Sequence, residues 1–500
     1  MLDNPELPAE GLDTSRTEST STEASAAAVE ADQSGDAASI PQPDPTKRII
    51  MSLDEFGAAK RVFKAHGNRF RFITDSQSLV TWDGARYGPF PHLAEGLAKD
   101  VMEKIQFDYI DGYFHVTEDG LEVERADVTK FQKKARTLSM IRKALNLVRL
   151  APKVQVKAGA FNENRYEINC LNGLLSLETE TIAPHDPNQL VTKLAPVRWN
   201  PGAPCDFWRT CIEEIALGDK DLVAYLQRLF GYCLTGSTQE EVMPIFYGTG
   251  ANGKSLCLGT LRMIMGSGEY AITLGTGSIL NSNFHGIRCD LRQLEGARVA
   301  FAIEVNHGST LDEAVVKAIT GGDEISARAM RENPVQFTPQ VKILMAVNHL
   351  PGFVGNDRGI RRRLQVIPFN HQYDGTVPKE VIERKLAAEA EGIFAWAVAG
   401  FHEWQKQGLN PPEVVRKATQ EYFQKNDHIG MYLAERTVET PNAMTPVRML
   451  FDDYRAWSRD FCVQALGLHQ FGELLRSRGI AQDRTSSERV WKGIAIRHII

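Results

Sequence analysis

The stretch VMPIFYGTGANGKSLCLGTLRMI, residues 242–264, decides the fold. It opens with the apolar run Val242–Tyr247 and closes with Leu256–Ile264, which has helical spacing. Between them, GTGANGKS at 248–255 matches the pattern G-x-x-x-x-G-K-[ST] in full. A Gly-rich segment between a strand and a helix predicts a phosphate-binding loop. The alternative for the same letters is an ordinary Gly-rich turn.

The residue types of this loop suit a polyphosphate. Small residues let backbone N–H groups surround phosphates without Cβ clashes, and the following helix adds the positive end of its dipole. Lys254 is expected to reach the β- and γ-phosphates, and the Ser255 hydroxyl to bind Mg²⁺. The residues predicted to bind ATP are Gly248, Thr249, Gly250, Ala251, Asn252, Gly253, Lys254 and Ser255.

Further apolar runs at Val299–Ile303 and Ile343–Val347, separated by helical patterns, predict an α/β fold with a parallel sheet. Glu304 ends the first run and is expected to manage the metal and the attacking water. Asn348 ends the second and is expected to orient that water or to sense the γ-phosphate. The alternatives are a solvated strand-end Glu and a turn-forming Asn before Leu350-Pro351.

Three consecutive arginines stand in DRGIRRRLQVIPF at 357–369, directly before an apolar run. An exposed run of charge is usually only solvated. An oligomeric ATPase, however, needs an arginine that reaches the γ-phosphate of a neighbouring subunit. The planar, permanently charged guanidinium suits that task better than an ammonium group.

Taken together, these motifs resemble those of the superfamily 3 helicases, and more narrowly the primase-helicases of phages and plasmids, which include the poxvirus primase-helicase. INCLNGLLSLETETIAPHDP at 168–187 and LDEAVVKAITGGDEISAR at 311–328 extend the resemblance, which covers most of residues 55–500. It implies an AAA+-like P-loop ATPase core.

The resemblance also implies roles for single residues. Glu304 closes motif B and joins Ser255 at the metal, and Asn348 matches motif C. The arginine finger falls in Arg362-Arg363. Arg363 is preferred because it lies six residues before Phe369.

The resemblance further implies a β-hairpin whose tip touches single-stranded DNA in the channel of a ring. Its arms would be Ile325–Ala329 and Val335–Thr338. Arg331 at the tip is the main candidate for DNA contact, with Lys317 and Arg328 as further candidates. An ordinary hairpin with a solvated arginine is the alternative.

Composition divides the chain into four predicted parts. Residues 1–46 hold ten Asp or Glu and one Arg, a net charge of −9, which leaves +3 for the rest of a chain whose total is −6. Residues 1–47 are therefore expected to be a disordered acidic tail. A mixed helical accessory domain at 48–235, the ATPase domain at 236–400, and a helical lid with a winged-helix module at 401–500 are expected to follow. The basic residues of that module fit a duplex or a protein partner equally well.

Composition also excludes several classes of protein. Hydrophobic content of 43% and charged content of 24% are those of a soluble globular protein. No apolar run reaches about 18 residues, and the acidic N-terminus is unlike a signal peptide. Seven cysteines without a CxxC pair give no support to a zinc site. We expect a cytoplasmic protein, in a bacterial host by resemblance.

The predicted activity is hydrolysis of ATP with Mg²⁺, coupled to translocation on single-stranded DNA and to strand separation at replication forks. Because the finger acts on a neighbour, the expected assembly is a homo-oligomeric ring, a hexamer. Residues 48–160 show no acidic metal-binding pattern, so a separate primase or other replication proteins are the expected partners. Two alternatives stay open: a primase-helicase with an unrecognised primase activity, and an origin-binding ATPase that assembles on DNA without unwinding it.

Overall fold

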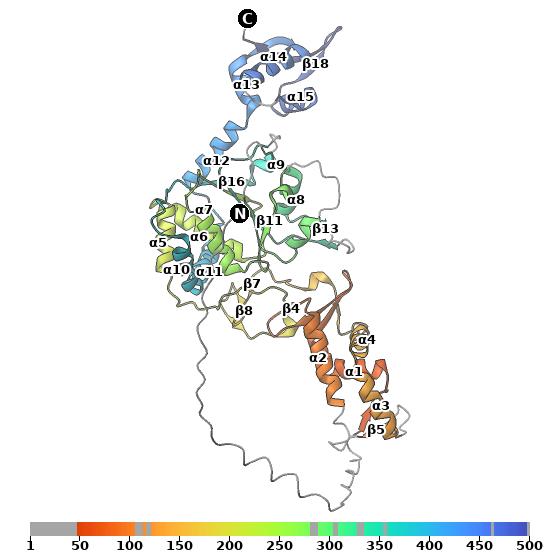
Figure 1. Ribbon diagram of the computed structural model, residues 1–500. Coiled ribbons are helices and arrows are strands. Elements are labelled where there is room, and N and C mark those ends of the chain that lie inside the picture. Colours follow the sequence, from red (N-terminus) through yellow and green to blue (C-terminus); the bar gives the residue numbers. More distant parts are fainter. Residues whose placement is uncertain are drawn as a thin grey trace, which may run out of the picture.

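The computed structural model describes residues 48–105, 114–116, 122–280, 289–303, 309–327, 335–353, 358–461 and 465–497. Three parts follow one another along the molecule (Figure 1). A largely helical N-terminal part lies at one end, an α/β core lies in the middle, and a small C-terminal part lies beyond the core.

The N-terminal part packs four helices against a small sheet. The helices are α1 (Glu55–His66), α2 (Pro91–Lys104), α3 (Arg125–Ala135) and α4 (Leu138–Val148). The sheet has the order β4-β3-β2-β6, with β2 (Phe70–Ile73), β3 (Ser78–Trp82), β4 (Tyr87–Gly88) and β6 (Gln155–Val156). A separate parallel pair is formed by β1 (Arg48–Ile50) and β5 (Phe114–Val116).

The basic helical stretch expected at 130–150 is two helices rather than one. Thr137 has extended backbone, and its hydroxyl accepts a hydrogen bond from the backbone N–H of Met140 at 3.3 Å. An N-cap of this kind starts a new helix and fixes its direction. The lysines of α3 and the Arg142-Lys143 pair of α4 therefore stand on separate elements.

A three-stranded antiparallel sheet links this part to the core. It consists of β7 (Glu167–Cys170), β8 (Gly173–Ser176) and β9 (Ile182–Ala183). The turn at Leu171-Asn172 joins β7 to β8, and Cys170 pairs with Gly173 across it. Gly173 has φ of 143°, and a Cβ there would stand 2.3 Å from the carbonyl oxygen of Ala183, so only glycine fits the turn.

The core is a five-stranded parallel sheet, which confirms the predicted α/β class. Its order is β11-β12-β15-β10-β16, with β10 (Met243–Tyr247), β11 (Ala271–Leu274), β12 (Val299–Ile303), β15 (Lys342–Val347) and β16 (Leu364–Pro368). The three apolar runs read from the sequence are β10, β12 and β15.

Helices cover both faces of this sheet. One face packs with α5 (Asp206–Ile215), α6 (Lys220–Leu234), α7 (Lys254–Met265), α10 (Lys379–Ala388) and α11 (Ala390–Gln407). The other packs with α8 (Glu313–Gly321), α9 (Arg358–Arg361) and α12 (Glu413–Lys425). Successive strand residues alternate between the two faces, as with Phe246 and Ile245, because side chains alternate along a strand.

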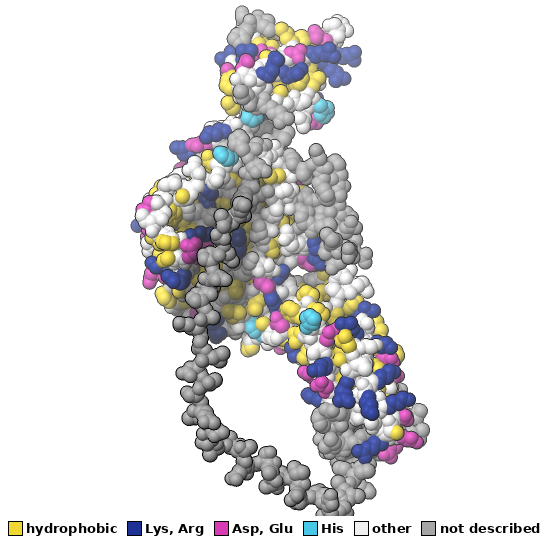
Figure 2. All heavy atoms as spheres, in the orientation of Figure 1, with side chains coloured by type: hydrophobic (Ala, Val, Ile, Leu, Met, Phe, Trp, Pro, Cys, Tyr) yellow, Lys and Arg dark blue, Asp and Glu magenta, His cyan; other side chains and the backbone are white. Residues whose placement is uncertain are grey.

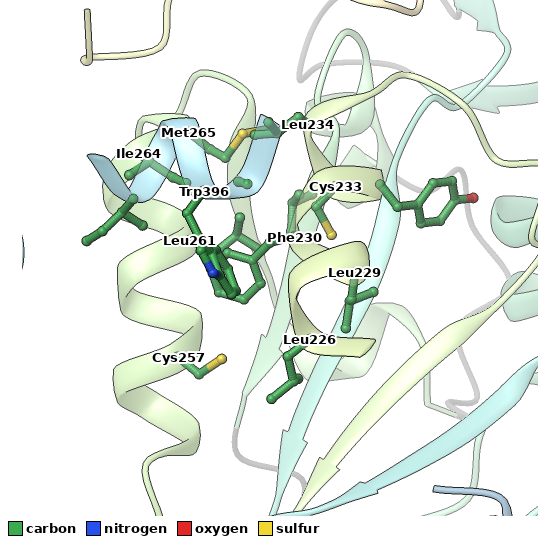
Figure 3. Close-up of a cluster of buried hydrophobic side chains, with 14 of the residues drawn as sticks. Leu226, Leu229, Phe230, Cys233, Leu234, Cys257, Leu261, Ile264, Met265 and Trp396 are labelled. Carbon is green, nitrogen blue, oxygen red and sulfur yellow. The ribbon is translucent and has the colours of Figure 1, made fainter. Parts of the chain in front are cut away.

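Helices α6 and α11 pack with their backbones almost in contact. A Cβ on Gly231 would lie 2.0 Å from the backbone nitrogen of Phe401, and one on Gly400 would lie 2.0 Å from the carbonyl oxygen of Gln227. Figure 3 shows how α6, α7 and Trp396 of α11 share one apolar cluster. The ATPase core therefore includes a helix that precedes residue 236 and one that continues past residue 400.

The remaining short elements connect these layers. An antiparallel pair, β13 (Ile325–Ala327) and β14 (Val335–Phe337), lies beside the core. Short 3-10 helices are η1 (Gly67–Arg69), η3 (Ala158–Ala160), η4 (Pro187–Gln189), η5 (Thr276–Ser278) and η6 (Cys289–Leu294).

The C-terminal part packs three helices against an antiparallel sheet. The elements are α13 (His428–Arg436), β17 (Thr437–Pro446), α14 (Val447–Asp460), α15 (Leu468–Ser477), β18 (Gln482–Arg484) and β19 (Arg489–Ile496), with sheet order β17-β19-β18. The sequence predicts α14, α15 and the terminal strand but misses β17. That strand contains Pro441, and its register shifts between Glu439 and Met444, so it lacks the regular alternation that marks a strand.

Two observations bear on the expected class of protein. No helix among the described residues has the length and apolar character needed to cross a membrane. Five cysteines are buried free thiols, as expected: Cys170, Cys205, Cys211, Cys233 and Cys257.

Candidate ATPase site

The phosphate-binding loop connects the central strand β10 to α7, as predicted. Gly250 has φ of 122° and Gly253 has φ of 85°, both in a region that glycine tolerates best. Ala251 also has a positive φ, of 49°. This backbone turns the chain tightly enough for α7 to begin at Lys254.

Asn252 clamps the loop, a role that the sequence analysis missed. Its side chain is buried, and its Oδ1 accepts a hydrogen bond from the backbone N–H of Gly250 at 2.5 Å. Its Nδ2 donates to the carbonyl oxygen of His371 at 2.7 Å. The backbone N–H of Tyr373 donates to the carbonyl of Ala251 at 2.9 Å. The segment after β16 therefore holds the loop in shape, and only a polar residue amid small ones hints at this in the sequence.

Lys254 lies inside the loop rather than in solvent. It is only 7% exposed, and its Nζ donates to the carbonyl oxygen of Gly248 at 2.6 Å. Burial lowers the pKa of this lysine, because the charged form loses hydration. A phosphate in the loop would supply the missing negative partner.

A large cavity adjoins the loop. Its volume is about 870 Å³, within the usual range for small-molecule sites. The loop and Asn348 form one side, and Tyr373 with the apolar residues of α10 forms the other. Apolar side chains beside a polyphosphate loop suit the base and sugar of a nucleotide. The apolar lining includes Met263, Tyr373, Val377, Ile382 and Leu386.

The donor set at the loop fits magnesium. Ser255 is exposed at the first turn of α7 and lines the cavity. No cluster of three metal-ligating side chains occurs in the part of the chain that the structure describes. Mg²⁺ at nucleotide sites uses one or two protein oxygens together with phosphates and waters. The Ser255 hydroxyl can therefore serve as one protein ligand without a cluster of carboxylates.

The structure brings Asn348 to the loop. β15 pairs directly with β10, and Asn348 follows β15 and lines the cavity. Glu304 lies outside the described residues. The strand that it follows, β12, pairs with β15 and not with β10, so that carboxyl end is one strand farther from the loop than Asn348.

The three arginines before β16 lie in three different environments. Arg361 places its guanidinium 5.2 Å from the centre of the Phe423 ring. The side chain of Arg362 is 59% exposed and forms an ion pair with Glu241. The side chain of Arg363 is 10% exposed and also pairs with Glu241, at 2.9 Å.

Arg363 has further partners inside the protein. Its Nε donates to the Thr320 hydroxyl at 3.0 Å, and its Nη1 donates to the carbonyl oxygen of Gly359 at 2.9 Å. A buried guanidinium with three intramolecular partners is not available to a neighbouring subunit. Arg362 is thus the more exposed of the two finger candidates, and the assignment of the finger to either residue stays a prediction.

All three arginines lie at the amino end of β16, whereas the phosphate loop of the same chain lies at the carboxyl end of the neighbouring β10. The backbone N–H of Met243 at the start of β10 donates to the carbonyl oxygen of Arg363 at 2.7 Å. The loop begins only after Tyr247, and four steps along a parallel strand span about 13 Å. The three arginines and the phosphate loop of the same chain are therefore separated along the strands.

The predicted hairpin forms, with Ile325 opposite Phe337 and Ala327 opposite Val335. Its tip, including Arg328 and Arg331, lies outside the described residues. Lys317 stands on α8 and forms an ion pair with Glu313 at 3.6 Å. It lies just before the hairpin in sequence, on the helix that leads into it.

Comparison with known proteins supports this assignment. The family model described as D5 N terminal like matches residues 59–216, and one described as a family of unknown function (DUF5906) matches residues 246–363. A protein of Acanthamoeba polyphaga mimivirus, provisionally named helicase L207/L206, is 28% identical over 258 residues, which are 48% of this chain and 27% of that protein.

More distant relatives come from other large DNA viruses. The provisionally named helicase 022R of Frog virus 3 is 22% identical over 45% of this chain and 25% of that protein. The provisionally named primase C962R of African swine fever virus (strain Badajoz 1971 Vero-adapted) is 21% identical over 55% of this chain and 31% of that protein. The chain thus spans about a quarter to a third of the length of these relatives.

Among solved structures, two apo forms of the NrS-1 C-terminal region cover 88% and 89% of this chain and 98% and 100% of their own. Their TM-scores are 0.42 and 0.44 at 10% and 12% identity, too low to carry a conclusion. The two family matches and the named viral relatives show that this chain is similar to D5-type viral proteins that carry helicase and primase names.

Proposed function

We propose that this protein is a DNA helicase that hydrolyses ATP to ADP and phosphate, and that it works as a ring in which each ATP site is shared by two subunits. One observation carries the proposal: the phosphate loop follows the carboxyl end of β10, whereas the exposed Arg362 precedes the amino end of the neighbouring β16. A chain with the phosphate loop at one end of its strands and the arginine at the other end is suited to repeated head-to-tail contact. Such contacts can close into a ring. A hexamer is the expected size.

The proposed chemistry divides between the two subunits. Lys254 and the loop amides of one chain hold the β- and γ-phosphates, and Asn348 orients the attacking water. Mg²⁺, for which Ser255 and Glu304 are the candidate ligands, would neutralise charge on the phosphates. Arg362 of the adjacent chain stabilises the negative charge that develops on the transferred phosphoryl group, a contribution of about 10³–10⁵-fold in related sites.

Three features support the AAA+-like core and its DNA target. The strand order places a polar strand end, Asn348, between the loop and the strand that leads to Glu304, as a water-positioning site requires. The hairpin β13–β14 offers a DNA contact, with Arg331 at its tip as the main candidate. The order of helices and strands in the C-terminal part, ending in an antiparallel hairpin, supports a winged-helix module.

The test of the shared site is a mixing experiment. Lys254→Ala removes the phosphate contact, and Arg362→Ala removes the trans contact, so each protein alone should be inactive. Mixed at equal total concentration, they should recover part of the DNA-stimulated hydrolysis, because some interfaces combine an intact loop with an intact arginine. Each variant alone at the same total concentration is the control. No recovery would count against a shared site.

The test of motor function uses duplexes with a 3′ or a 5′ single-stranded tail. The wild-type protein should displace the annealed strand from one of the two substrates when ATP and Mg²⁺ are present. DNA-stimulated hydrolysis without displacement would favour an origin-binding ATPase instead. Templated synthesis of a primer by the purified chain would establish the primase alternative.

The hairpin assignment has its own test. Arg331→Ala should weaken single-strand binding while hydrolysis without DNA persists. Lys317→Ala, on the neighbouring α8, is the matched variant and should have a smaller effect because Lys317 already pairs with Glu313. Equal affinity of wild type and Arg331→Ala would remove the tip from the DNA path.

A further inference from the structure

The N-terminal part carries an unusual concentration of positive charge. Residues 125–149 hold eight Lys or Arg and one Asp, a net charge of +7. In α3, Val128, Phe131 and Ala135 face the core, while Lys130, Lys133 and Lys134 are exposed. Residues three and four apart share one side of a helix, so the three ammonium groups lie together. Figure 2 shows many Lys and Arg side chains on the surface of the N-terminal part.

The acids nearby neutralise α4 but not α3. Lys143 pairs with Glu55 at 3.1 Å, and the Nε of Arg142 lies 2.7 Å from Glu95. In the described part of the chain, Lys130, Lys133 and Lys134 form no ion pair. Surfaces that are merely solvated usually intersperse both signs of charge. Three adjacent lysines that form no ion pair instead attract a polyanion.

An exposed aromatic ring lies at the edge of these lysines. Phe56 on α1 is 63% exposed. It follows Glu55, whose carboxylate is held by Lys143 and is also within the electrostatic reach of Lys134. Phe56 therefore belongs to the same neighbourhood as the lysines. An exposed ring beside a basic surface can stack on an unpaired base of a single strand. The bases of a duplex are already stacked on one another and are not accessible in this way.

We propose that Lys130, Lys133, Lys134 and Phe56, here called the α3 face, form a second binding surface for single-stranded nucleic acid. The lysines would contact backbone phosphates without regard to sequence, and Phe56 would stack on a base. This surface is distinct from the ATPase site and the hairpin, and it does not depend on ATP. It would hold a strand before or after its passage through the motor.

The experiment measures the affinity of the full chain for a mixed-sequence single strand of about 30 nucleotides, without nucleotide or Mg²⁺, over a range of salt. A triple variant, Lys130→Glu, Lys133→Glu and Lys134→Glu, should bind at least about tenfold more weakly at low salt, with the slope of log affinity against log salt reduced by about 2. The matched control reverses three exposed lysines elsewhere: Lys220, Lys406 and Lys417.

Phe56→Leu separates stacking from charge. It should weaken single-strand binding about tenfold, the value of one stacked base, and leave duplex binding unchanged. Leu150→Ala, which trims an exposed apolar residue of the same part, is its control. If Phe56→Leu has no effect and duplex affinity falls with the lysines as much as single-strand affinity, the single-strand assignment is wrong.

Equal affinities and salt slopes for the α3 triple and the control triple would overturn the proposal. Hydrolysis without DNA should be unchanged in both triples, since neither touches the loop or Arg362. If the Lys→Glu triple unfolds, Lys→Gln at the same positions keeps the measurement possible. Binding is read directly, so a protein without helicase activity would still give an answer here.

Discussion

The fold contains two groups of neighbouring basic residues that differ in their contacts. One is Arg361–Arg363 before β16, and the other is Lys130, Lys133 and Lys134 on α3. Each arginine has a defined intramolecular contact, with Phe423, with Glu241, or with Glu241 and Thr320. The α3 lysines have no ion-pair partner in the described structure and stay in solvent. A planar guanidinium with five donors can be fixed by protein groups, whereas a hydrated ammonium on a flexible stem tends to remain outside. Adjacent like charges therefore say little about function until their partners are known.

The largest expected effect is the loss of ATP hydrolysis when Arg362, and not Arg363, is the arginine that acts on the adjacent site. Arg362→Ala should lower hydrolysis by about 10³-fold or more while ATP binding changes little, because the finger acts on the transition state of the adjacent site. Steady-state hydrolysis and equilibrium nucleotide binding measure the two parts. Exposed Arg455 on α14 provides the matched control, and Arg455→Ala should keep its activity. Near-normal hydrolysis by Arg362→Ala would return the finger to Arg363.

Removing Arg363 should instead destabilise the core. Arg363→Ala leaves the Thr320 hydroxyl and the Gly359 carbonyl without their partner, and leaves Glu241 with the exposed Arg362 alone, at a cost of about 3 kcal/mol. Thermal or denaturant unfolding would measure the loss. Arg362→Ala serves as the comparison, since an exposed ion pair contributes less than about 1 kcal/mol. Equal stability of the two variants would contradict the distinction between the two environments.

A third cation, Lys342, tests what burial does to a lysine. Its Nζ donates to the carbonyl oxygen of Thr235, its ammonium lies 5.1 Å from the centre of the Tyr232 ring, and burial lowers its pKa to about 7. Between pH 7 and the ordinary lysine pKa of 10.5, the unfolded chain binds a proton that the folded protein has released. The stability of the folded state should therefore rise with pH in this window, by about 1.4 kcal/mol per pH unit from this group.

The measurement is unfolding at several pH values in wild type and in Lys342→Met. The difference between the two free energies of unfolding should change with pH as stated and flatten below pH 7. A difference independent of pH would mean that Lys342 keeps its proton in the fold. Lys130→Met is the control, because an exposed lysine should give no such slope.

The smallest expected effect concerns Arg361. Its contact with the Phe423 ring should contribute about 0.5–1 kcal/mol to the packing of α12 against the start of β16. A double-mutant cycle with Arg361→Ala and Phe423→Leu measures that coupling. A coupling near zero would make Arg361 a solvated residue like the α3 lysines and weaken the contrast between the two groups.

Much of the architecture could be predicted because it depends on local pattern. The apolar runs became β10, β12 and β15, and the Gly-rich segment became the turn into α7. The strand β17 could not be predicted, because Pro441 and a register shift interrupt the alternation of apolar and polar residues that marks a strand. The clamp by Asn252 could not be predicted either, since its partner His371 lies far along the chain and only the sheet brings them together.

The sequence by itself determined that a phosphate loop follows a buried strand, because glycine, lysine and serine at fixed spacing leave few alternatives for backbone and charge. It also determined that three arginines precede the last strand of the sheet. Only the tertiary structure decided that these arginines lie at the amino end of β16, the opposite end of the strands from their own loop. It alone decided which guanidinium is buried, because burial depends on Glu241, Thr320 and Gly359, contacts that arise only when the sheet and α8 pack together.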